Sequence, residues 1–460
     1  MMYDLVILGG GPGGYGAAEY AARLGLGVAL VERDRLGGTC LNRGCVPTKA
    51  YLHTAEAVRE ASAFAPGLPA QFDRAAMLKS KNETVDTLVK GIGLLMKAGK
   101  VAVYEGQGTL LNAESPFSVQ VMRRDGASET LQGRAVLIAT GSEPSRLPLP
   151  GCDNPALWTS DDLLGEAGAQ PFQSLLIVGG GVIGVEMACV YARLGVAVTV
   201  VEAEKRCLPM MDLEISRSAE ALLKGLGVTV LTDAHLERID SDALHGGFTA
   251  TYRKDNASGS AWAERALMAT GRRPVTDGLL GEGVSLAMNR RAIAVDEHFR
   301  TSIAGVYAIG DVNGVFQLAH AAHAQGVASV SHFAGVISPI NPSLVPSCVY
   351  TAPEIASVGL TQEEAKARGL EVVVGKALTT QNARTLIEGL GRGFIKLLFD
   401  RPTRKLVGAQ LFCGRATDMI GELTVAIENG LTAEALLRPL RPHPTFEESI
   451  TDAVLSAKFD

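Results

Sequence analysis

The sequence predicts an α/β fold built around two dinucleotide-binding units, and two observations carry that prediction. The chain contains two Gly-x-Gly-x-x-Gly turns, at Gly9–Gly14 and Gly179–Gly184, and each directly follows an apolar run typical of a buried strand. Glycine also makes up 52 of the 460 residues, about 11 % against a typical ~7 %. This excess indicates many tight turns and places where the backbone approaches a ligand closely.

The first unit begins with the apolar run Leu5–Leu8 and continues through Gly9, Gly11 and Gly14 into a second strand that ends at Glu32. In a βαβ unit of this kind, the glycines let the backbone reach a pyrophosphate at the N-terminus of the helix. The acid accepts hydrogen bonds from the adenine ribose, and here it follows the third glycine by 18 residues. The alternative is a glycine-rich turn in some other α/β sheet.

The second unit repeats the first with an offset of 170 residues, from position 9 to position 179. Gly179, Gly181 and Gly184 follow the apolar run Leu175–Val178, and Glu202 takes the place of the first acid. A matched second copy favours two Rossmann-like units over an unrelated turn. Two such units imply two bound dinucleotides.

The residues around Glu202 bear on which nicotinamide nucleotide binds the second unit. A carboxylate at the end of the strand repels the 2′-phosphate of NADP, so Glu202 favours NAD. Lys205 and Arg206 follow closely and could bind that phosphate instead. Because the acid lies at the strand end, we favour NAD and interpret the basic pair as a solvated loop.

Two further segments predict where the chain crosses between the units. Leu137–Gly141 and Leu267–Gly271 each indicate a buried strand that stops at a glycine turn. They place the boundaries near 145–150 and near 270. A third strand ends at Gly310-Asp311. An acid in that position could bind a polyol chain, cap the next helix, or do both.

A pair of cysteines lies just after the first unit, in the segment Gly37–Lys49. In a regular helix, residues five apart diverge too far for a disulfide, so Cys40 and Cys45 can close a ring only where the chain is irregular. Gly44 permits that irregularity, and Pro47 suits the first turn of a helix that begins just after Cys45. A thiol beside a helix N-terminus is favoured as a thiolate, which indicates a redox centre. The alternative is two buried free cysteines.

The remaining cysteines and the overall charge limit the class of protein. We interpret five scattered cysteines as packing residues: Cys152, Cys189, Cys207, Cys348 and Cys413. The net charge is −6 and no basic run stands out, so we expect no nucleic-acid partner. We find no apolar run of about 18 residues and no basic segment with a cleavage site at the N-terminus, so we expect no membrane association and a cytoplasmic location. No pattern predicts a metal site.

Together these motifs resemble the class I pyridine nucleotide-disulfide oxidoreductases, flavoproteins that bind FAD and a nicotinamide nucleotide. The resemblance runs nearly from end to end. The segment Gly37–Lys49 is most similar to that of the dihydrolipoamide dehydrogenase branch, and Leu318-Ala319-His320 is similar to the same branch. Pro346–Glu354 resembles the opening of the family's interface domain, and His443–Glu448 matches its His-Pro-Thr-x-x-Glu.

The resemblance implies an architecture of two Rossmann-like domains, one for FAD and one for NAD, with a C-terminal α+β dimerisation domain. The FAD domain would comprise two segments, 1–149 and 271–337. The NAD domain would span 150–270, and the interface domain 338–460. The protein would then be a homodimer.

The resemblance also implies roles for individual residues. Cys40 would be the thiol that exchanges with the substrate sulfur, and Cys45 the thiol on the flavin side. His443 would be the base that removes the proton of the substrate thiol, contributed by the partner subunit, and Glu448 would hold its tautomer. A histidine satisfied within a proline-rich loop is the alternative for His443.

Two further charged residues and the cofactor contacts follow from the same resemblance. Lys49 and Glu186 would pair beside the flavin N5, although Glu186 alone could simply complement its helix dipole. The predicted FAD contacts are Gly9, Gly11, Gly14, Glu32, Gly38, Thr39, Lys49, Thr140, Gly141, Gly310, Asp311, Ala319 and His320. The predicted NAD contacts are Gly179, Gly181, Gly184, Glu186, Glu202 and Gly271.

The function implied is oxidation of dihydrolipoyl groups with reduction of NAD+ through a Cys40–Cys45 disulfide and FAD. The partner would be a lipoylated carrier protein, or the acyltransferase of a 2-oxo acid dehydrogenase or glycine cleavage complex. One alternative is an NADPH-dependent reductase of another small disulfide, such as glutathione. A second is a flavoprotein redox subunit that does not turn over. The sequence departs from the branch at Arg441-Pro442, at Glu447 and at Ala321-Ala322-His323, which bear on the substrate channel.

Overall fold

A seven-stranded sheet forms the first nucleotide unit in the computed structural model, which describes residues 2–64, 73–242 and 246–459. Its strand order is β3-β2-β1-β6-β5-β4, with β18 paired to β6. The strands are β1 (Met2–Leu8), β2 (Val28–Glu32), β3 (Ala102–Glu105), β4 (Gln107–Leu110), β5 (Phe117–Met122), β6 (Ser128–Ile138) and β18 (Val306–Ala308). The strands β1, β2, β3, β6 and β18 pair in parallel. The apolar side chains of β1, β2, β6 and β18 are buried apart from Met2, because helices cover the sheet, whereas Val103 of the edge strand β3 is exposed.

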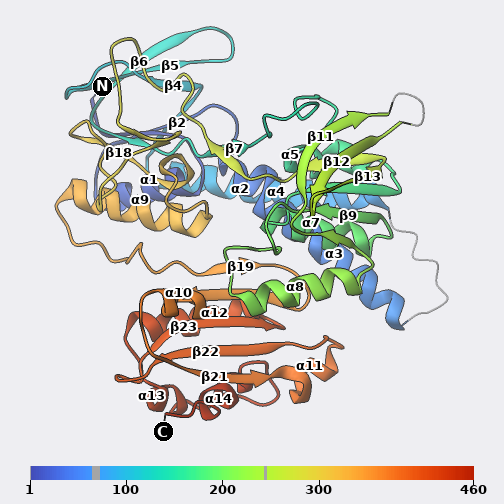
Figure 1. Cartoon of the computed structure of the whole chain (residues 1–460). Coiled ribbons are helices and arrows are strands. Elements are labelled where there is room, and N and C mark those ends of the chain that lie inside the picture. The colour runs from blue at the N-terminus through green and yellow to red at the C-terminus, as the bar shows by residue number, and fades with distance from the viewer. Residues whose placement is uncertain (1, 65–72, 243–245, 460) are drawn as a thin grey trace.

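The helices of this unit come from two distant parts of the sequence. Helix α1 (Pro12–Arg23) begins within the first glycine turn, directly after Gly11, and packs against α9 (Ala319–Ala334), as Figure 1 shows. Helices α2 (Gly38–Arg43), α3 (Cys45–Phe64) and α4 (Arg74–Ala98) follow β2. The 3-10 turn η1 (Gly310–Asn313) leads from β18 towards α9.

The second nucleotide unit has a parallel four-stranded sheet in the order β10-β9-β8-β14. Helix α7 (Val182–Arg193) begins within the second glycine turn, directly after Gly181, and α8 (Leu213–Gly225) follows β9. An antiparallel sheet of β11, β12 and β13 lies beside it. The strands are β8 (Ser174–Val178), β9 (Ala197–Val201), β10 (Thr229–Leu231), β11 (His235–Ser241), β12 (Phe248–Lys254), β13 (Ala257–Ala263) and β14 (Arg265–Met268), preceded by the short helices α5 (Ser160–Leu163) and α6 (Glu166–Ala169).

The chain passes between the two units at a two-stranded antiparallel ladder. Strand β7 (Ser142–Pro144) leaves the first unit and β15 (Arg272–Pro274) returns to it, with Ser142 opposite Pro274. Both strands follow the glycine turns that mark the predicted crossings, so the second unit is inserted into the first. The pair β16 (Met288–Asn289) and β17 (Ala292–Ile293) forms a further small hairpin.

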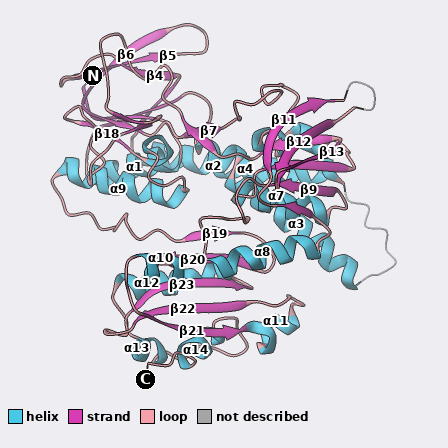
Figure 2. Cartoon of the chain, viewed as in Figure 1, coloured by secondary structure: helices cyan, strands magenta, loops and turns pink. Residues whose placement is uncertain are grey.

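The C-terminal part of the chain folds around a five-stranded sheet in the order β19-β20-β23-β22-β21. Figure 2 shows helices α12 (Ala416–Glu428) and α14 (Glu448–Leu455) packed against these strands. The strands are β19 (Ser347–Val349), β20 (Glu354–Gly359), β21 (Val372–Leu378), β22 (Phe394–Asp400) and β23 (Leu406–Cys413). The remaining elements are α10 (Gln362–Ala367), η2 (Thr379–Gln381), α11 (Ala383–Ile387) and α13 (Ala433–Leu437).

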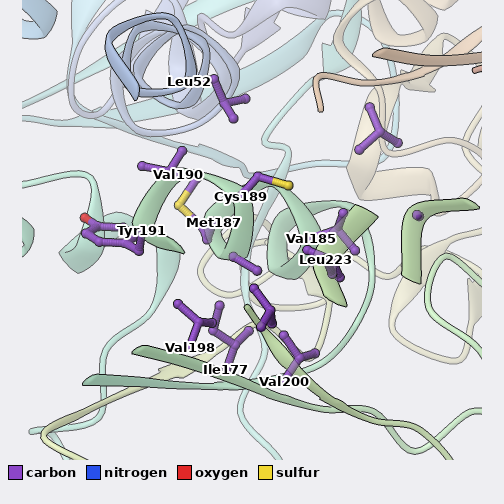
Figure 3. Packing of buried hydrophobic residues seen from close by; sticks show 14 of the residues in the cluster. Leu52, Ile177, Val185, Met187, Cys189, Val190, Tyr191, Val198, Val200 and Leu223 are labelled. Carbon is purple, nitrogen blue, oxygen red and sulfur yellow. The ribbon is translucent and has the colours of Figure 1, made fainter. Parts of the chain in front are cut away.

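The largest hydrophobic cluster lies around α7, where side chains on all sides of the helix are buried (Figure 3). Val185 and Val190 of the helix, Ile177 and Val198 of the sheet, and Leu52 of α3 all belong to this cluster. In Figure 3, Val190 lies on the side of the helix that faces Leu52, and Ile177 and Val198 lie on the opposite side. Burial on every side explains why α7 is mostly apolar, with Glu186 and Arg193 as its charged residues. The cluster fixes α3, which follows the cysteine segment, against the second nucleotide unit.

The α/β fold with a C-terminal α+β unit agrees with the sequence prediction. The division into 1–149 with 271–337, 150–270 and 338–460 remains our proposal. It is supported by the arrangement of the strands, because each large sheet lies within one of these parts. Among the helices that the structure describes, none combines the length and apolarity needed to cross a membrane.

Candidate active site

One cavity of about 1120 Å³ connects both glycine turns with the cysteine segment. It is larger than the roughly 300–1,000 Å³ of most small-molecule sites, which suits extended dinucleotides. The structure brings most of the predicted site residues to its walls: Gly9, Gly11, Glu32, Gly38, Thr39, Cys40, Cys45, Lys49, Thr140, Gly141, Gly181, Glu186, Gly271, Gly310, Asp311, Ala319 and His320. Gly14, Gly179, Gly184, Glu202, His443 and Glu448 do not line it.

The third glycine of each turn serves packing, which explains its absence from the cavity wall. A Cβ on Gly14 would lie 1.8 Å from the carbonyl oxygen of Gly9, and a Cβ on Gly184 would lie 2.0 Å from that of Gly179. Neither contact is possible, so only glycine lets the helix approach the strand this closely. A tight turn at the start of each helix fits a pyrophosphate held by backbone N–H groups.

The two acids have matching hydrogen bonds. Glu32 accepts from the backbone N–H of Gly10 at 2.6 Å and from that of Asp34 at 2.7 Å. Glu202 accepts from the N–H of Gly180 and from that of Glu204. These bonds hold each carboxylate at the end of its strand, beside the glycine turn, where a ribose would bind.

The interpretation of Lys205 and Arg206 as a solvated loop is wrong for Arg206. Its guanidinium makes two hydrogen bonds to Glu363, at 3.1 Å and 2.8 Å, and donates to the carbonyl oxygens of Pro209 and Met211. The pairing with Glu363 raises the pKa of Arg206. Arg206 is therefore held by protein acceptors, and Lys205 is the exposed basic residue that remains beside Glu202.

The cysteine segment folds as two helices separated by Gly44. Cys40 lies within α2 and Cys45 is the first residue of α3, within one residue of the predicted helix start. A Cβ on Gly44 would lie 3.0 Å from the carbonyl oxygen of Thr39, so a larger residue would disturb the break. The structure gives both cysteines as free thiols, and the disulfide between them stays a prediction.

The two thiols have opposite acidities because they share a hydrogen bond. The bond from the Cys40 side chain lowers the pKa of Cys45 to about 7, and the charge of Lys49 acts in the same direction against desolvation. The same bond, together with burial, raises the pKa of Cys40 well above its usual range. Cys45 is therefore the thiolate of the pair near neutral pH.

A charged network lies beside Cys45. It is formed by Lys49, one helical turn further along α3, with Glu186 and Tyr350. The Lys49 ammonium lies 3.0 Å from both carboxylate oxygens of Glu186, a side chain that is only 4 % exposed. The backbone N–H of Tyr350 donates to Glu186 at 2.9 Å, and Lys49 lies 4.4 Å from the centre of the Tyr350 ring. The carboxylate thus holds the lysine at a fixed point of the cavity wall.

His443 and Glu448 meet outside the cavity. Nδ1 of His443 lies 2.8 Å from Oε1 of Glu448, and the other carboxylate oxygen accepts from the N–H of Thr445. These bonds, first that from Thr445, lower the pKa of Glu448. The His443 side chain is 72 % exposed, so its Nε2 is open to a second molecule.

Of the two roles predicted for Asp311, binding a polyol chain and capping the next helix, the structure contradicts the second. It lies within the 3-10 turn η1, and α9 begins only at Ala319, so it does not cap a helix. The hydroxyl of Ser142 donates to its carboxylate, and the guanidinium of Arg272 donates to Ser142 at 2.7 Å. Burial raises the pKa of Asp311, which is therefore a polar group held inside the cavity wall.

Two cavity residues were missed from the sequence, and a third was given only part of its role. Tyr350 and Arg272 line the cavity, but no spacing rule connects either with the cysteines. Cys348 packs against the hydrophobic cluster of the C-terminal unit, as expected, and also lines this cavity; burial raises its pKa to about 11. The other four scattered cysteines are buried, as expected.

A low-pKa thiol and a thiol partner, placed between two dinucleotide turns, define a disulfide oxidoreductase that uses two dinucleotides. Residues 3–326 match the family model described as pyridine nucleotide-disulphide oxidoreductase, and residues 345–454 match its dimerisation domain. The chain belongs to the pyridine nucleotide-disulphide oxidoreductase family. This membership confirms FAD and NAD as the cofactors and supports a homodimer.

Curated relatives cover almost the whole chain. It is 40 % identical to a dihydrolipoyl dehydrogenase of Bacillus subtilis, covering 99 % of this chain and 98 % of the relative. It is 37 % identical to one of Trypanosoma brucei brucei, covering 99 % and 96 %. Among solved structures, LpdA from Mycobacterium tuberculosis has a TM-score of 0.89 at 28 % identity, covering 98 % of both chains. The Cu(II) complex of the HOCl-induced flavoprotein disulfide reductase RclA from Escherichia coli has a TM-score of 0.87 at 29 % identity, covering 99 % of both.

Proposed function

We propose that this enzyme is a dihydrolipoyl dehydrogenase, which oxidises dihydrolipoyl groups with NAD+. The observation that carries the proposal is the single cavity in which Cys40, Cys45 and both nucleotide turns meet. The curated dihydrolipoyl dehydrogenases that align with nearly the entire chain support the choice of substrate. Glu202, fixed beside the second turn, supports NAD over NADP.

The thiol chemistry follows from the two acidities. His443 removes a proton from a substrate thiol, and the resulting thiolate attacks Sγ of Cys40 in the oxidised enzyme. The Cys40–Cys45 bond breaks, and its electron pair leaves on Cys45, the better leaving group because its pKa is low. His443 releases this first proton to solvent and then removes the proton of the second substrate thiol. The resulting thiolate attacks the substrate sulfur of the mixed disulfide, closes the lipoyl ring and releases Cys40, which takes up the proton held by His443.

The charged network holds the product of this exchange in place. Lys49 faces the Cys45 thiolate and is fixed by Glu186, so negative charge on the sulfur is stabilised without movement of the lysine. FAD, when bound, supplies the two-electron carrier between the dithiol and the nicotinamide. The predicted flavin and coenzyme contacts that line the cavity remain our assignment for the two groups.

We further propose that His443 acts in the partner subunit of a homodimer. His443 belongs to the C-terminal part of the chain and does not line the cavity of its own subunit. The match to the dimerisation domain supports a dimer in which this exposed side chain completes the neighbouring site. A lipoylated carrier protein or acyltransferase of a 2-oxo acid dehydrogenase or glycine cleavage complex is the proposed source of the substrate. The cytoplasmic location is likewise proposed, and fractionation of the native cells tests it.

The decisive experiment compares nucleotides and disulfides on the purified, FAD-loaded protein. Anaerobic titration with NADH and with NADPH is followed by assays with lipoamide and with glutathione disulfide. Turnover of lipoamide with NADH, and a long-wavelength thiolate–flavin band on reduction, are the expected results. Glutathione turnover with NADPH would instead indicate a reductase of another small disulfide, and no turnover a redox subunit.

A further inference from the structure

The segment that follows Glu202 connects the coenzyme site with the dimerisation domain. We call residues 203–212 the coenzyme loop. It begins beside the acid expected to bind the adenine ribose and ends at Asp212, the N-cap of α8. Arg206 within the loop and Asp212 at its end make ionic contacts with the dimerisation domain, which includes residues 345–454. These contacts lie outside the thiol chemistry.

The first contact is the pair between Arg206 and Glu363. Two parallel hydrogen bonds join them, and the same guanidinium donates to the carbonyl oxygens of Pro209 and Met211 within the loop. Arg206 therefore ties the loop to itself and to α10 at once. A two-bond guanidinium–carboxylate contact fixes orientation as well as distance.

The second contact is a buried pair between Asp212 and Lys396 of β22. Both carboxylate oxygens lie 3.0 Å from the ammonium, and the side chains are only 2 % and 6 % exposed. Asp212 also accepts from the N–H of Glu214 at the start of α8. A buried pair with both charges satisfied specifies one arrangement of the two domains, since removing one partner leaves a buried charge.

The loop also contacts the groups expected to hold the coenzyme. Leu208 donates its N–H to the carbonyl oxygen of Gly180, which lies between Gly179 and Gly181 of the second glycine turn. A Cβ on Gly180 would lie 2.8 Å from Sγ of Cys207 and 3.1 Å from Glu202, so these three residues are in close contact. Displacement of the loop would thus move both the turn and the acid.

We propose that the dimerisation domain sets the affinity of the adenosine half of the NAD site by holding the coenzyme loop, with Glu363 and Lys396 as positioning residues. The inference rests on the proposed function for its coenzyme but not for its substrate. A held loop is already ordered when the coenzyme arrives, whereas a released loop must be ordered at the expense of affinity. The effect is confined to coenzyme binding, because the loop does not line the cavity with the thiols.

The test uses the FAD-loaded dimer with Glu363→Gln, and with Glu371→Gln as the matched control. Glu371 contacts Arg401 on the surface of the same domain, away from the loop. A second variant, Asp212→Asn with Lys396→Met, removes the buried charges together and keeps a good N-cap. Calorimetry with ADP-ribose measures binding of the adenosine half without any turnover, and gel filtration and Tm verify the fold.

Glu363→Gln is expected to weaken ADP-ribose binding about two- to fivefold, as suits an exposed ion pair. The double variant is expected to weaken it at least as much, because it removes the buried contact that orients the loop. The KM for NAD+ should rise in parallel, with kcat and the KM for dihydrolipoamide unchanged. Glu371→Gln should match the unaltered enzyme. Unchanged ADP-ribose affinity in both loop variants, or equal losses for both substrates, would overturn the inference. Absence of lipoamide turnover in the unaltered enzyme would refute the proposed function while leaving the ADP-ribose test valid.

Discussion

At the scale of single residues, the acidity of Cys45 is the property on which the chemistry depends. Its pKa of about 7 comes from the hydrogen bond with Cys40 and from the charge of Lys49. Neither contribution needs the helix as a whole. Each contribution can be removed by a single substitution of its own, so the two can be measured separately.

Replacing Cys45 by serine should abolish lipoamide turnover and leave FAD bound. The hydroxyl cannot take part in disulfide exchange, whereas the flavin would be held by the first nucleotide unit. Turnover and flavin content per subunit are the measurements. Cys413→Ala, at a buried thiol outside the cavity, serves as the control and should keep both. Residual turnover above a few per cent in Cys45→Ser would refute the assigned sulfur route.

The thiolate of the two-electron-reduced enzyme should appear with a midpoint near pH 7. The pKa of Cys45 is lowered from the ordinary value of 9.0 to about 7, so the charged form is lost as the pH falls through 7 rather than through 9. The long-wavelength thiolate–flavin band, followed from pH 5.5 to 9.5, reports this step.

Lys49→Met should move that midpoint upward, because the lysine charge lowers the pKa of Cys45. Lys79→Met, on an exposed part of α4, provides a charge-matched control with no expected shift. A midpoint unaffected by Lys49→Met would contradict the assigned electrostatics.

The sequence predicted which residues carry the chemistry better than it predicted their partners. Cys40, Cys45 and the glycine turns are recognisable because each belongs to a short pattern with a fixed geometry. The contacts of Tyr350 with Glu186 and Lys49 cross from one domain to another, and no local spacing encodes them. Arg206 was misread for the same reason, since its partner Glu363 is distant in sequence.

At the scale of elements, the second and third glycines of a glycine turn have separate roles. The third glycine is required for the packing of helix on strand, whereas the second glycine of the NAD unit, Gly181, leaves its Cβ position free of protein atoms. A Cβ on Gly181 would meet nothing within 4 Å, although the residue lines the cavity. This separation allows binding and folding to be tested by neighbouring substitutions.

Gly181→Ala should fold normally and bind NAD+ more weakly, because the added methyl group points into space that the pyrophosphate needs. Gly184→Ala should instead lower Tm or prevent folding, since its Cβ would lie 2.0 Å from the carbonyl oxygen of Gly179. Thermal denaturation and calorimetry with NAD+ separate the two outcomes. Equal losses of Tm in both variants would contradict this division of roles.

The elements of the nucleotide units could be predicted because apolar strands and glycine turns are local signals. Helix α3 was placed within one residue from Gly44 and Pro47. The antiparallel sheet β11–β13 and the sheet order were not predicted, because pairing between distant strands has no signature in a single sequence.

At the scale of the whole molecule, the candidate base and the thiols lie in different parts of one chain. His443 lies between α13 and α14, whereas Cys40 belongs to α2 and Cys45 begins α3. Figure 1 shows α2 and α14 in separate parts of the molecule. The dimerisation domain was predicted from the resemblance to the family alone, because nothing in the composition or periodicity of residues 338–460 indicates a partner. Contribution of His443 in trans is testable without a structure of the dimer.

Mixed dimers of His443→Gln and Cys45→Ser should regain activity that neither homodimer has. His443→Gln alone should lose roughly 10²–10⁴-fold in kcat as the loss of a general base. When equal amounts are denatured and reassembled, half of the dimers are mixed and each has one intact site, so about a quarter of full activity is expected. No recovery on mixing would show that base and thiols come from the same subunit.

The ladder of β7 and β15 brings the two ends of the inserted unit side by side. Ser145 donates its N–H to the carbonyl oxygen of Gly271 at 2.9 Å, so the chain departs and re-enters at neighbouring points. A foreign coenzyme module could therefore be spliced between these points without stretching the host. Exchange of such a module would change which nucleotide is reduced and leave the sulfur chemistry to the host protein. The contacts that residues 206 and 212 make with the dimerisation domain would have to be rebuilt.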